Sequence, residues 1–275
     1  MPSRHIYTVQ PYVLDLEELT IKRKTERIAA LTKKNSDFIE AVVKIDSNYK
    51  RDMRNVPPHP DFDPENNSKD SDGKYCGSLT YWFTEMQNPN ANYAQCVLGA
   101  VIAIDRGNST HLEQVLDGRK KMRDRIIALC PDVQTLKAAL ETPFTHNNEN
   151  HLISKMTEPG LKGIKDGNDR FFISFASKFC AYAALVLHTN LEYSKFDDVV
   201  SDYLFLYAYA YCGLEFNKTD FKINQIQGGF AIKRSKGLEI YERYQQTIES
   251  IISSLTFNMT RSELDHIIWY YEKGK

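Results

Sequence analysis

A nearly continuous apolar stretch decides the fold of this chain: residues Phe171 to Leu187 read FFISFASKFCAYAALVL. A helix formed from this stretch is apolar almost all round, and helices of that kind are buried. Its polar residues, Ser174, Ser177 and Lys178, are spaced i, i+3 and i+4 and share one facet of such a helix. The sequence therefore predicts one lysine held against an apolar core.

Two interpretations of Lys178 follow from the pattern. The lysine either marks the solvated edge of a core helix or is held partly desolvated. Desolvation disfavours the charged ammonium and lowers the pKa, and a neutral amine is a nucleophile. Periodicity alone leaves both interpretations open.

An aspartate cluster opens the next apolar run, 19 residues after Lys178. Asp197 or Asp198 is expected to cap a helix that Gly213 closes, and acidic residues are favoured in a first helical turn. Aromatic residues at every second position from Tyr203 to Tyr211 are also compatible with a strand. A capping aspartate is fixed in direction and stays ionised, as a catalytic carboxylate must.

The remaining chain contains helical periodicity and little strand pattern, which predicts an all-α fold. We expect an N-terminal helical segment at residues 1–55, a loop or linker at 56–75 that is rich in Pro, Asp, Asn and Ser, and a main helical domain at 76–275. Within that domain, residues 227–237 are expected to form a basic loop bracketed by glycines, followed by helices at 238–255 and 261–271.

Composition bounds the function only loosely. The 275 residues carry a formal net charge of -1, so any nucleic-acid surface must be a local basic patch. The five cysteines are widely spaced without a CxxC pair, and the histidines have no metal-ligand spacing. We expect no metal, no cofactor and no membrane span, and a reducing, cytoplasmic compartment.

The run from Ser174 to Lys178 resembles the hairpin of the helix-hairpin-helix DNA glycosylases of the 8-oxoguanine class. That pattern is glycine, apolar, glycine, hydroxyl residue and catalytic lysine, with a catalytic aspartate after an apolar residue at the head of the next long helix, here Phe196-Asp197. The strings FISFASKFC and LDHIIWYYEKG are similar to bacterial proteins described as having the 8-oxoguanine-glycosylase fold. The resemblance covers mainly residues 169–203.

This resemblance implies a DNA N-glycosylase for DNA repair, with or without abasic-site lyase activity, that acts on duplex DNA containing a modified base. Lys178 would be the nucleophile and Asp197 the carboxylate that stabilises charge on the sugar. The implied DNA-binding residues are Ser174, Ala176 and Ser177 in a hairpin just before a helix that starts near Lys178, and Asn88 in the space left by the extruded base. The most plausible further phosphate contacts are Lys120, Lys121, Arg123, Lys233, Arg234 and Lys236.

The chain also departs from the family pattern. Ser174 and Ala176 replace both hairpin glycines, which normally let the backbone approach a phosphate closely. The alternative functions are a non-catalytic DNA- or protein-binding module on the same helical fold, and a helical interaction domain in which Lys178 and Asp197 form an internal salt bridge.

Overall fold

The computed structural model of the chain describes residues 54–65, 76–108, 110–255 and 258–273. All regular elements within these ranges are α- or 3₁₀-helices, accompanied by two isolated β-bridges. The all-α class predicted from the sequence is therefore confirmed. No helix in the described ranges is both long and apolar enough to cross a lipid bilayer. All five cysteines are free thiols.

The predicted domain boundaries fall largely outside the described residues. The described residues exclude nearly all of the N-terminal segment at 1–55 and residues 66–75 of the expected linker. The described part of that linker, 56–65, holds no helix and packs on the body of the protein. Phe62 reaches the hydrophobic core, and Glu65 forms an ion pair with Arg123. The three-part division stays a prediction.

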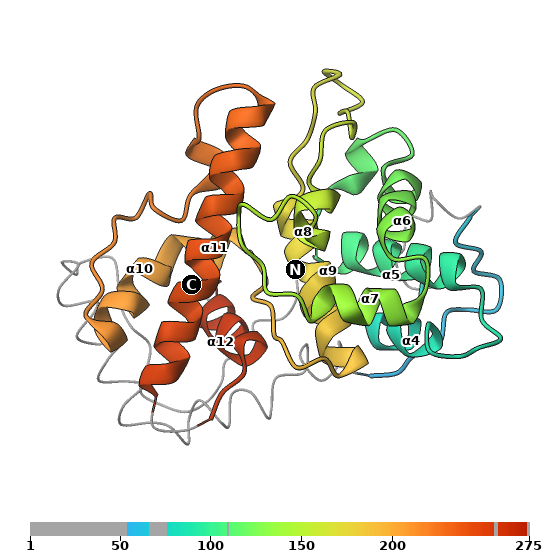
Figure 1. Cartoon of the computed structure of the whole chain (residues 1–275), viewed down its shortest axis with the longest axis horizontal. Coiled ribbons are helices and arrows are strands. Elements are labelled where there is room, and N and C mark those ends of the chain that lie inside the picture. Colours follow the sequence, from blue (N-terminus) through green and yellow to red (C-terminus); the bar gives the residue numbers. More distant parts are fainter. Residues whose placement is uncertain (1–53, 66–75, 109, 256–257, 274–275) are drawn as a thin grey trace.

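One group of helices includes the apolar stretch at residues 171–187. That stretch forms α9 (Ile173–Leu187), which packs against four other helices of the group. Nearly all of its side chains are buried, as its composition requires. Figure 1 shows this group around α9. Its other members are α4 (Leu79–Glu85), α5 (Tyr93–Asn108), η1 (Leu112–Gln114), α6 (Gly118–Leu129), α7 (Val133–Leu140) and α8 (Leu152–Met156).

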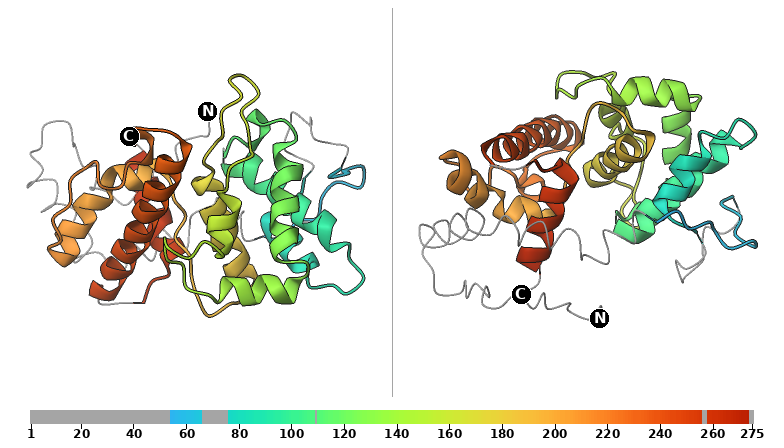
Figure 2. Two further views of the ribbon diagram at one scale, coloured as in Figure 1. Left: turned by 45° about the horizontal axis from the view of Figure 1, so that its top comes forward. Right: turned by 90° about the horizontal axis from the view of Figure 1, so that it is seen from below.

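A second group of helices lies on the other side of α9 (Figures 1 and 2). It consists of α10 (Asp198–Cys212), η2 (Ile223–Gln225), α11 (Phe230–Ser254) and α12 (Arg261–Lys273). The helices α10, α11 and α12 pack against one another, and α11 also contacts α9. A single cluster of buried side chains runs through both groups, so they share one core.

The start and end of α10 follow the capping rules. The Asp197 carboxylate accepts a hydrogen bond from the backbone N–H of Val199 at 2.9 Å, and Gly213 ends the helix in the left-handed region with φ of 66°. This confirms the predicted cap and closing glycine. The aromatic residues from Tyr203 to Tyr211 are helical, so the alternative of a strand is excluded.

The basic segment expected to form a loop at residues 227–237 is mostly helical, which corrects the sequence prediction. The helix α11 begins at Phe230, eight residues before the expected start at Leu238. Gly237 is a packing residue inside this helix rather than a helix breaker. A Cβ atom at position 237 would lie 2.4 Å from Cε1 of the Phe171 ring, so only glycine allows this close approach.

We predict that Gly237→Ala destabilises the protein by about 1–3 kcal/mol, because the added methyl group overpacks the contact with Phe171. The matched control is Gly107→Ala, since Gly107 is also helical and a Cβ there meets nothing within 4 Å. Helix propensity should make that control more stable by roughly 0.5–1 kcal/mol. Equilibrium unfolding in urea measures both changes, and equal effects of the two substitutions would contradict this account of Gly237.

Candidate functional site

A cleft of about 1290 Å³ is lined by residues from both groups of helices. One wall comes from the end of α5, the connector before α9 and the first turns of α9. The other wall comes from the start of α10, η2, the start of α11 and one side chain of α12. Lys178 and Asp197 both line this cleft. The two residues singled out from the sequence therefore face the same cavity.

Lys178 lies in the second turn of α9, and only 8% of its side chain is exposed. The family pattern predicts a hairpin over the preceding residues and a helix start close to the lysine. The helix instead begins at Ile173, so the run from Ser174 to Ser177 is helical. Serine and alanine accept helical backbone angles readily, and without the family's glycines nothing in this run forces a turn.

The amine of Lys178 and the carboxylate of Asp197 form a close ion pair. The Nζ–Oδ2 distance is 3.6 Å, while Oδ1 of Asp197 serves as the cap of α10. Both oxygens of this carboxylate are therefore engaged, one by the backbone and the other by the lysine. The cap fixes the direction of the carboxylate and so fixes the partner of the amine.

Burial lowers the pKa of the Lys178 amine below its ordinary value of 10.5. The negative charge of Asp197 acts in the opposite direction and raises this pKa, whereas the positive charge of Lys195 lowers it. A lowered pKa enlarges the fraction of neutral amine near neutral pH, and only the neutral form has a lone pair for nucleophilic attack. The environment of Lys178 therefore suits a nucleophile.

The three residues of the expected hairpin differ in their access to the cleft. Ser174 is half-buried and lines the cleft, together with its neighbours Ile173 and Phe175. Ala176 and Ser177 are fully buried. The hydroxyl of Ser177 donates to the carbonyl of Ser174 at 3.1 Å, inside the protein. Only Ser174 of the three has a side chain at the cavity wall.

Asn88 lies away from the cleft. It is exposed in the turn between α4 and α5, where its amide donates to Oε1 of Glu85 at 2.8 Å. Phe83, in the helix α4 before this turn, is fully buried and packs edge-on against Phe179 at 5.4 Å between ring centroids. The structure thus does not bring Asn88 together with Lys178 and Asp197.

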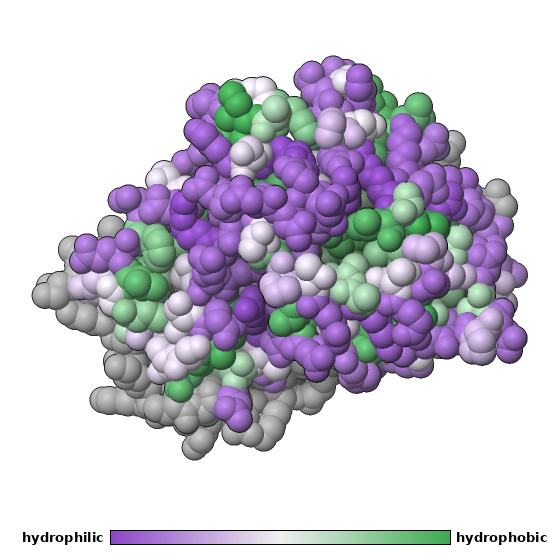
Figure 3. Space-filling model, viewed as in Figure 1, coloured by the Kyte–Doolittle hydropathy of each residue, from purple (hydrophilic) through white to green (hydrophobic). Residues whose placement is uncertain are grey.

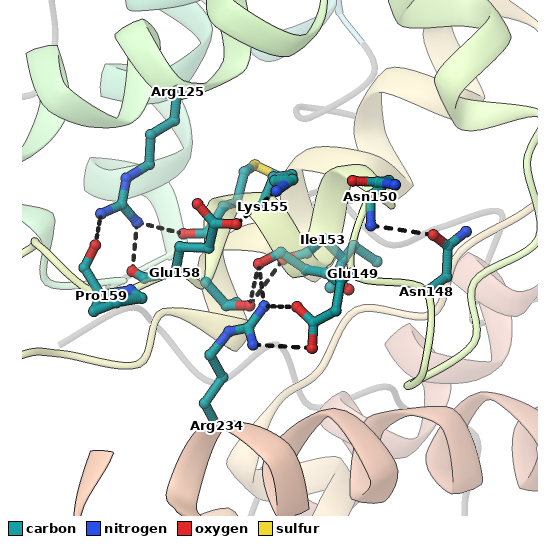
Figure 4. Close-up of polar contacts among 12 residues, drawn as sticks. Arg125, Asn148, Glu149, Asn150, Ile153, Lys155, Glu158, Pro159 and Arg234 are labelled. Carbon is teal, nitrogen blue, oxygen red and sulfur yellow. Dashed lines mark hydrogen bonds and ion pairs between the residues drawn. The ribbon is translucent and has the colours of Figure 1, made fainter. Parts of the chain in front are cut away.

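Among the basic residues suggested by the sequence, Lys233 alone lines the cleft. Arg234, its neighbour on α11, points instead toward α8 and the segment before it. It donates to the Glu149 carboxylate before α8 at 2.6 Å (Figure 4) and to the Ser154 carbonyl within α8 at 3.0 Å. Lys120 and Arg123 of α6 pair with Glu65. Lys121 and Lys236 are exposed outside the cleft.

Several cleft residues were missed by the sequence analysis. Lys162 and Arg170 come from the turn-rich connector before α9, and Arg170 pairs with Asp166 at 2.9 Å. The connector's position next to the lysine segment was a signal that these cations lie near the site. The aromatic lining residues Phe230 and Trp269 carry no comparable local signal, because they come from distant elements.

Within the described ranges, no three His, Cys, Asp or Glu side chains are grouped so that they could hold a metal ion. Figure 3 shows hydrophilic side chains over most of the face that it presents, with scattered apolar patches.

Comparisons of the chain with protein-family models, with curated proteins and with solved structures found no match. The resemblance to the helix-hairpin-helix glycosylases accordingly rests on the motifs around Lys178 and Asp197 and on the sequence near the C-terminus.

We predict that the pKa of Lys178 lies below 10.5 and falls further in Asp197→Asn, because that substitution removes the charge that raises the pKa. Asparagine is also a good helix cap, so the start of α10 is retained. Side-chain NMR of lysine-labelled protein measures the titration, and the resonance absent from Lys178→Gln assigns it. A wild-type pKa of 10.5 or above, or a higher pKa in Asp197→Asn, would contradict the assigned environment.

Proposed function

We propose that this protein is a DNA N-glycosylase, with or without abasic-site lyase activity, in which Lys178 is the nucleophile and Asp197 the stabilising carboxylate. The observation that carries the proposal is the desolvated Lys178 amine in a wide cleft, 3.6 Å from the Asp197 carboxylate that caps α10. A nucleophilic lysine needs a lowered pKa and access to substrate, and this position combines both. The motif resemblance supplies the reaction class.

The reaction would begin after the modified nucleotide has left the base stack, because the glycosidic bond is otherwise inaccessible. The Lys178 lone pair forms a bond to the sugar C1′ as the bond from C1′ to the base nitrogen breaks, and the base leaves with that electron pair. One amine proton passes to the departing base. The nitrogen lone pair then forms the C1′=N bond of the Schiff base as the C1′–O4′ bond breaks, and O4′ takes up a proton from water. Asp197, still ionised, stabilises the positive charge that develops on the sugar.

The cleft offers groups that suit a phosphate backbone. Lys162, Arg170 and Lys233 supply positive charge from both walls. The helices α9 and α11 both begin at the cleft, and neither has a side-chain cap. The N–H groups at a helix start favour anions, so the starts of α9 and α11 add to the positive charge of these three side chains. The aromatic lining rings provide flat apolar surfaces beside the catalytic pair.

The competing function is a non-catalytic binding module on the same fold. It is favoured by the absence of the glycine hairpin, since α9 begins without the turn that would bring the backbone to a phosphate. In that case the Lys178–Asp197 pair would act as an internal salt bridge. Removing either partner would then cost stability and leave binding unchanged.

We predict that sodium borohydride traps a covalent complex between the wild-type protein and duplex DNA that contains a modified base or an abasic site. Lys178→Gln should form no adduct, because no amine remains at C1′. Asp197→Asn should trap more slowly by roughly a hundredfold, since it loses charge stabilisation while keeping the cap. The control is Lys155→Gln, a surface lysine paired with Glu158 outside the cleft.

Denaturing gels resolve the trapped complexes, and chromatography of released bases reports glycosylase activity without lyase chemistry. If neither base release nor trapping is detected across a panel of lesions, the proposal is rejected in favour of the binding module. Equal trapping by Lys178→Gln and wild type would reject Lys178 as the nucleophile.

We predict that Lys233→Gln weakens binding to a duplex with a tetrahydrofuran abasic analogue and lowers the slope of log affinity against log salt concentration by about 0.9, as expected for one lost phosphate contact. Arg234→Gln is the matched comparison, because the neighbouring Arg234 is engaged by Glu149 and Ser154. That variant should lower thermal stability and leave the salt slope unchanged. Fluorescence anisotropy measures the slopes, and identical slopes for Lys233→Gln and wild type would contradict a role of Lys233 in phosphate binding.

A further inference from the structure

The non-helical segment that leads into Asp197 is held by side chains from two helices of the second group. On α12, the Asp265 carboxylate accepts a hydrogen bond from the backbone N–H of Lys195 at 2.7 Å. On α11, Tyr244 donates to the Lys195 carbonyl at 3.0 Å, and Tyr241 donates to the Ser194 carbonyl at 2.8 Å. The backbone just before the aspartate is thus bonded on one side to α11 and α12.

Ser177 holds the same segment from the opposite side. Its Oγ accepts a hydrogen bond from the backbone N–H of Phe196 at 2.9 Å and donates to the carbonyl of Ser174 at 3.1 Å. The serine side chain is fully buried. Ser177 directly precedes Lys178, and Phe196 directly precedes Asp197. This hydrogen bond therefore joins the two chain positions next to the members of the ion pair.

We propose that Ser177 is a positioning residue, whose hydroxyl sets the separation between the Lys178 amine and the Asp197 carboxylate. The helix α9 carries the lysine, and the segment at 193–197 carries the aspartate. The hydrogen bond from the Phe196 N–H to Ser177 joins these two elements next to the ion pair, and Lys195 adds a contact over the Tyr182 ring of α9 at 5.0 Å. A rigid link at this place keeps the carboxylate beside the amine while DNA enters and leaves.

Loss of the hydroxyl has two consequences that differ from a loss of stability. The buried N–H of Phe196 loses its acceptor, so the segment at 193–197 moves to find another partner. Asp197 then lies farther from Lys178, and less of its charge reaches the amine. Since that charge raises the pKa of Lys178, the pKa falls when the pair separates. Misplacement of a catalytic group also slows the reaction.

The proposal rests on the proposed function for its effect on rate, and the test includes a readout that needs no activity. Ser177→Ala is compared with Ser194→Ala, which removes an equally buried hydroxyl from the same region. The hydroxyl of Ser194 has no hydrogen-bond partner among the residues that the structure describes, so its removal breaks no link there. Ser177→Thr restores a hydroxyl. If Ser177→Ala does not fold, Ser177→Cys replaces it, because a thiol fills the volume but accepts hydrogen bonds only weakly.

The side-chain NMR titration should show a lower pKa for Lys178 in Ser177→Ala, an unchanged pKa in Ser194→Ala, and a pKa near the wild-type value in Ser177→Thr. Single-turnover trapping on saturating abasic duplex should slow by roughly tenfold or more in Ser177→Ala alone, with unchanged affinity for DNA. An equal Lys178 pKa in the two alanine variants would overturn the positioning role. Absence of both trapping and base release by the wild-type protein would contradict the proposed function, and the pKa comparison would still decide the role of Ser177.

Discussion

The structure depends on the ion pair between an amine inside an apolar helix and the carboxylate that caps the next helix. The sequence of α9 forces the helix into the core, and the lysine is buried with it. A buried charge is costly unless it is paired. Asp197 meets this requirement with one oxygen and uses the other to cap α10. The carboxylate therefore connects the stability of α10 with the ionisation of Lys178.

This arrangement places the cleft at the junction of the two helix groups. The helix α9 belongs to the first group, and the helices behind Asp197 belong to the second. Tyrosines from α11 and an aspartate from α12 hold the segment in front of Asp197, so that the position of the carboxylate is determined by several elements at once. The pKa of this α12 carboxyl, Asp265, is raised to about 7, because the effect of burial exceeds the lowering effects of Lys195 and Tyr244. A preorganised pair such as Lys178 and Asp197 is what nucleophilic catalysis by a lysine requires.

Much of the local structure could be predicted because it depends on neighbouring residues. The all-α class follows from periodicity, and the cap at Asp197 and the end at Gly213 follow from residue type. The start of α11 could not be predicted, because Gly237 has low helix propensity and its place inside the helix reflects close packing against the distant Phe171 ring. The hairpin expected before Lys178 was wrong for a related reason. The family pattern suggested a turn, whereas Ser174 and Ala176 allow the helix to begin earlier.

For the candidate site, the sequence indicated which two residues to compare and little of their geometry. The family pattern paired Lys178 with Asp197, and the structure brings the two side chains together. The role of Ser177 was not visible, because its acceptor function depends on Phe196, 19 residues away. The location of Lys233 in the cleft and of Arg234 outside it also depends on the helical phase of α11, which the sequence assigned to a loop.

Peptide mapping of the borohydride-trapped complex tests the central claim most directly. After nuclease and trypsin digestion, an adduct on Lys178 blocks cleavage at that residue and yields one modified peptide spanning residues 171–195. The proposed mechanism predicts that mass spectrometry finds the sugar remnant on Lys178 within this peptide. An adduct on Lys195, Lys233 or another lysine, together with normal cleavage after Lys178, would contradict it.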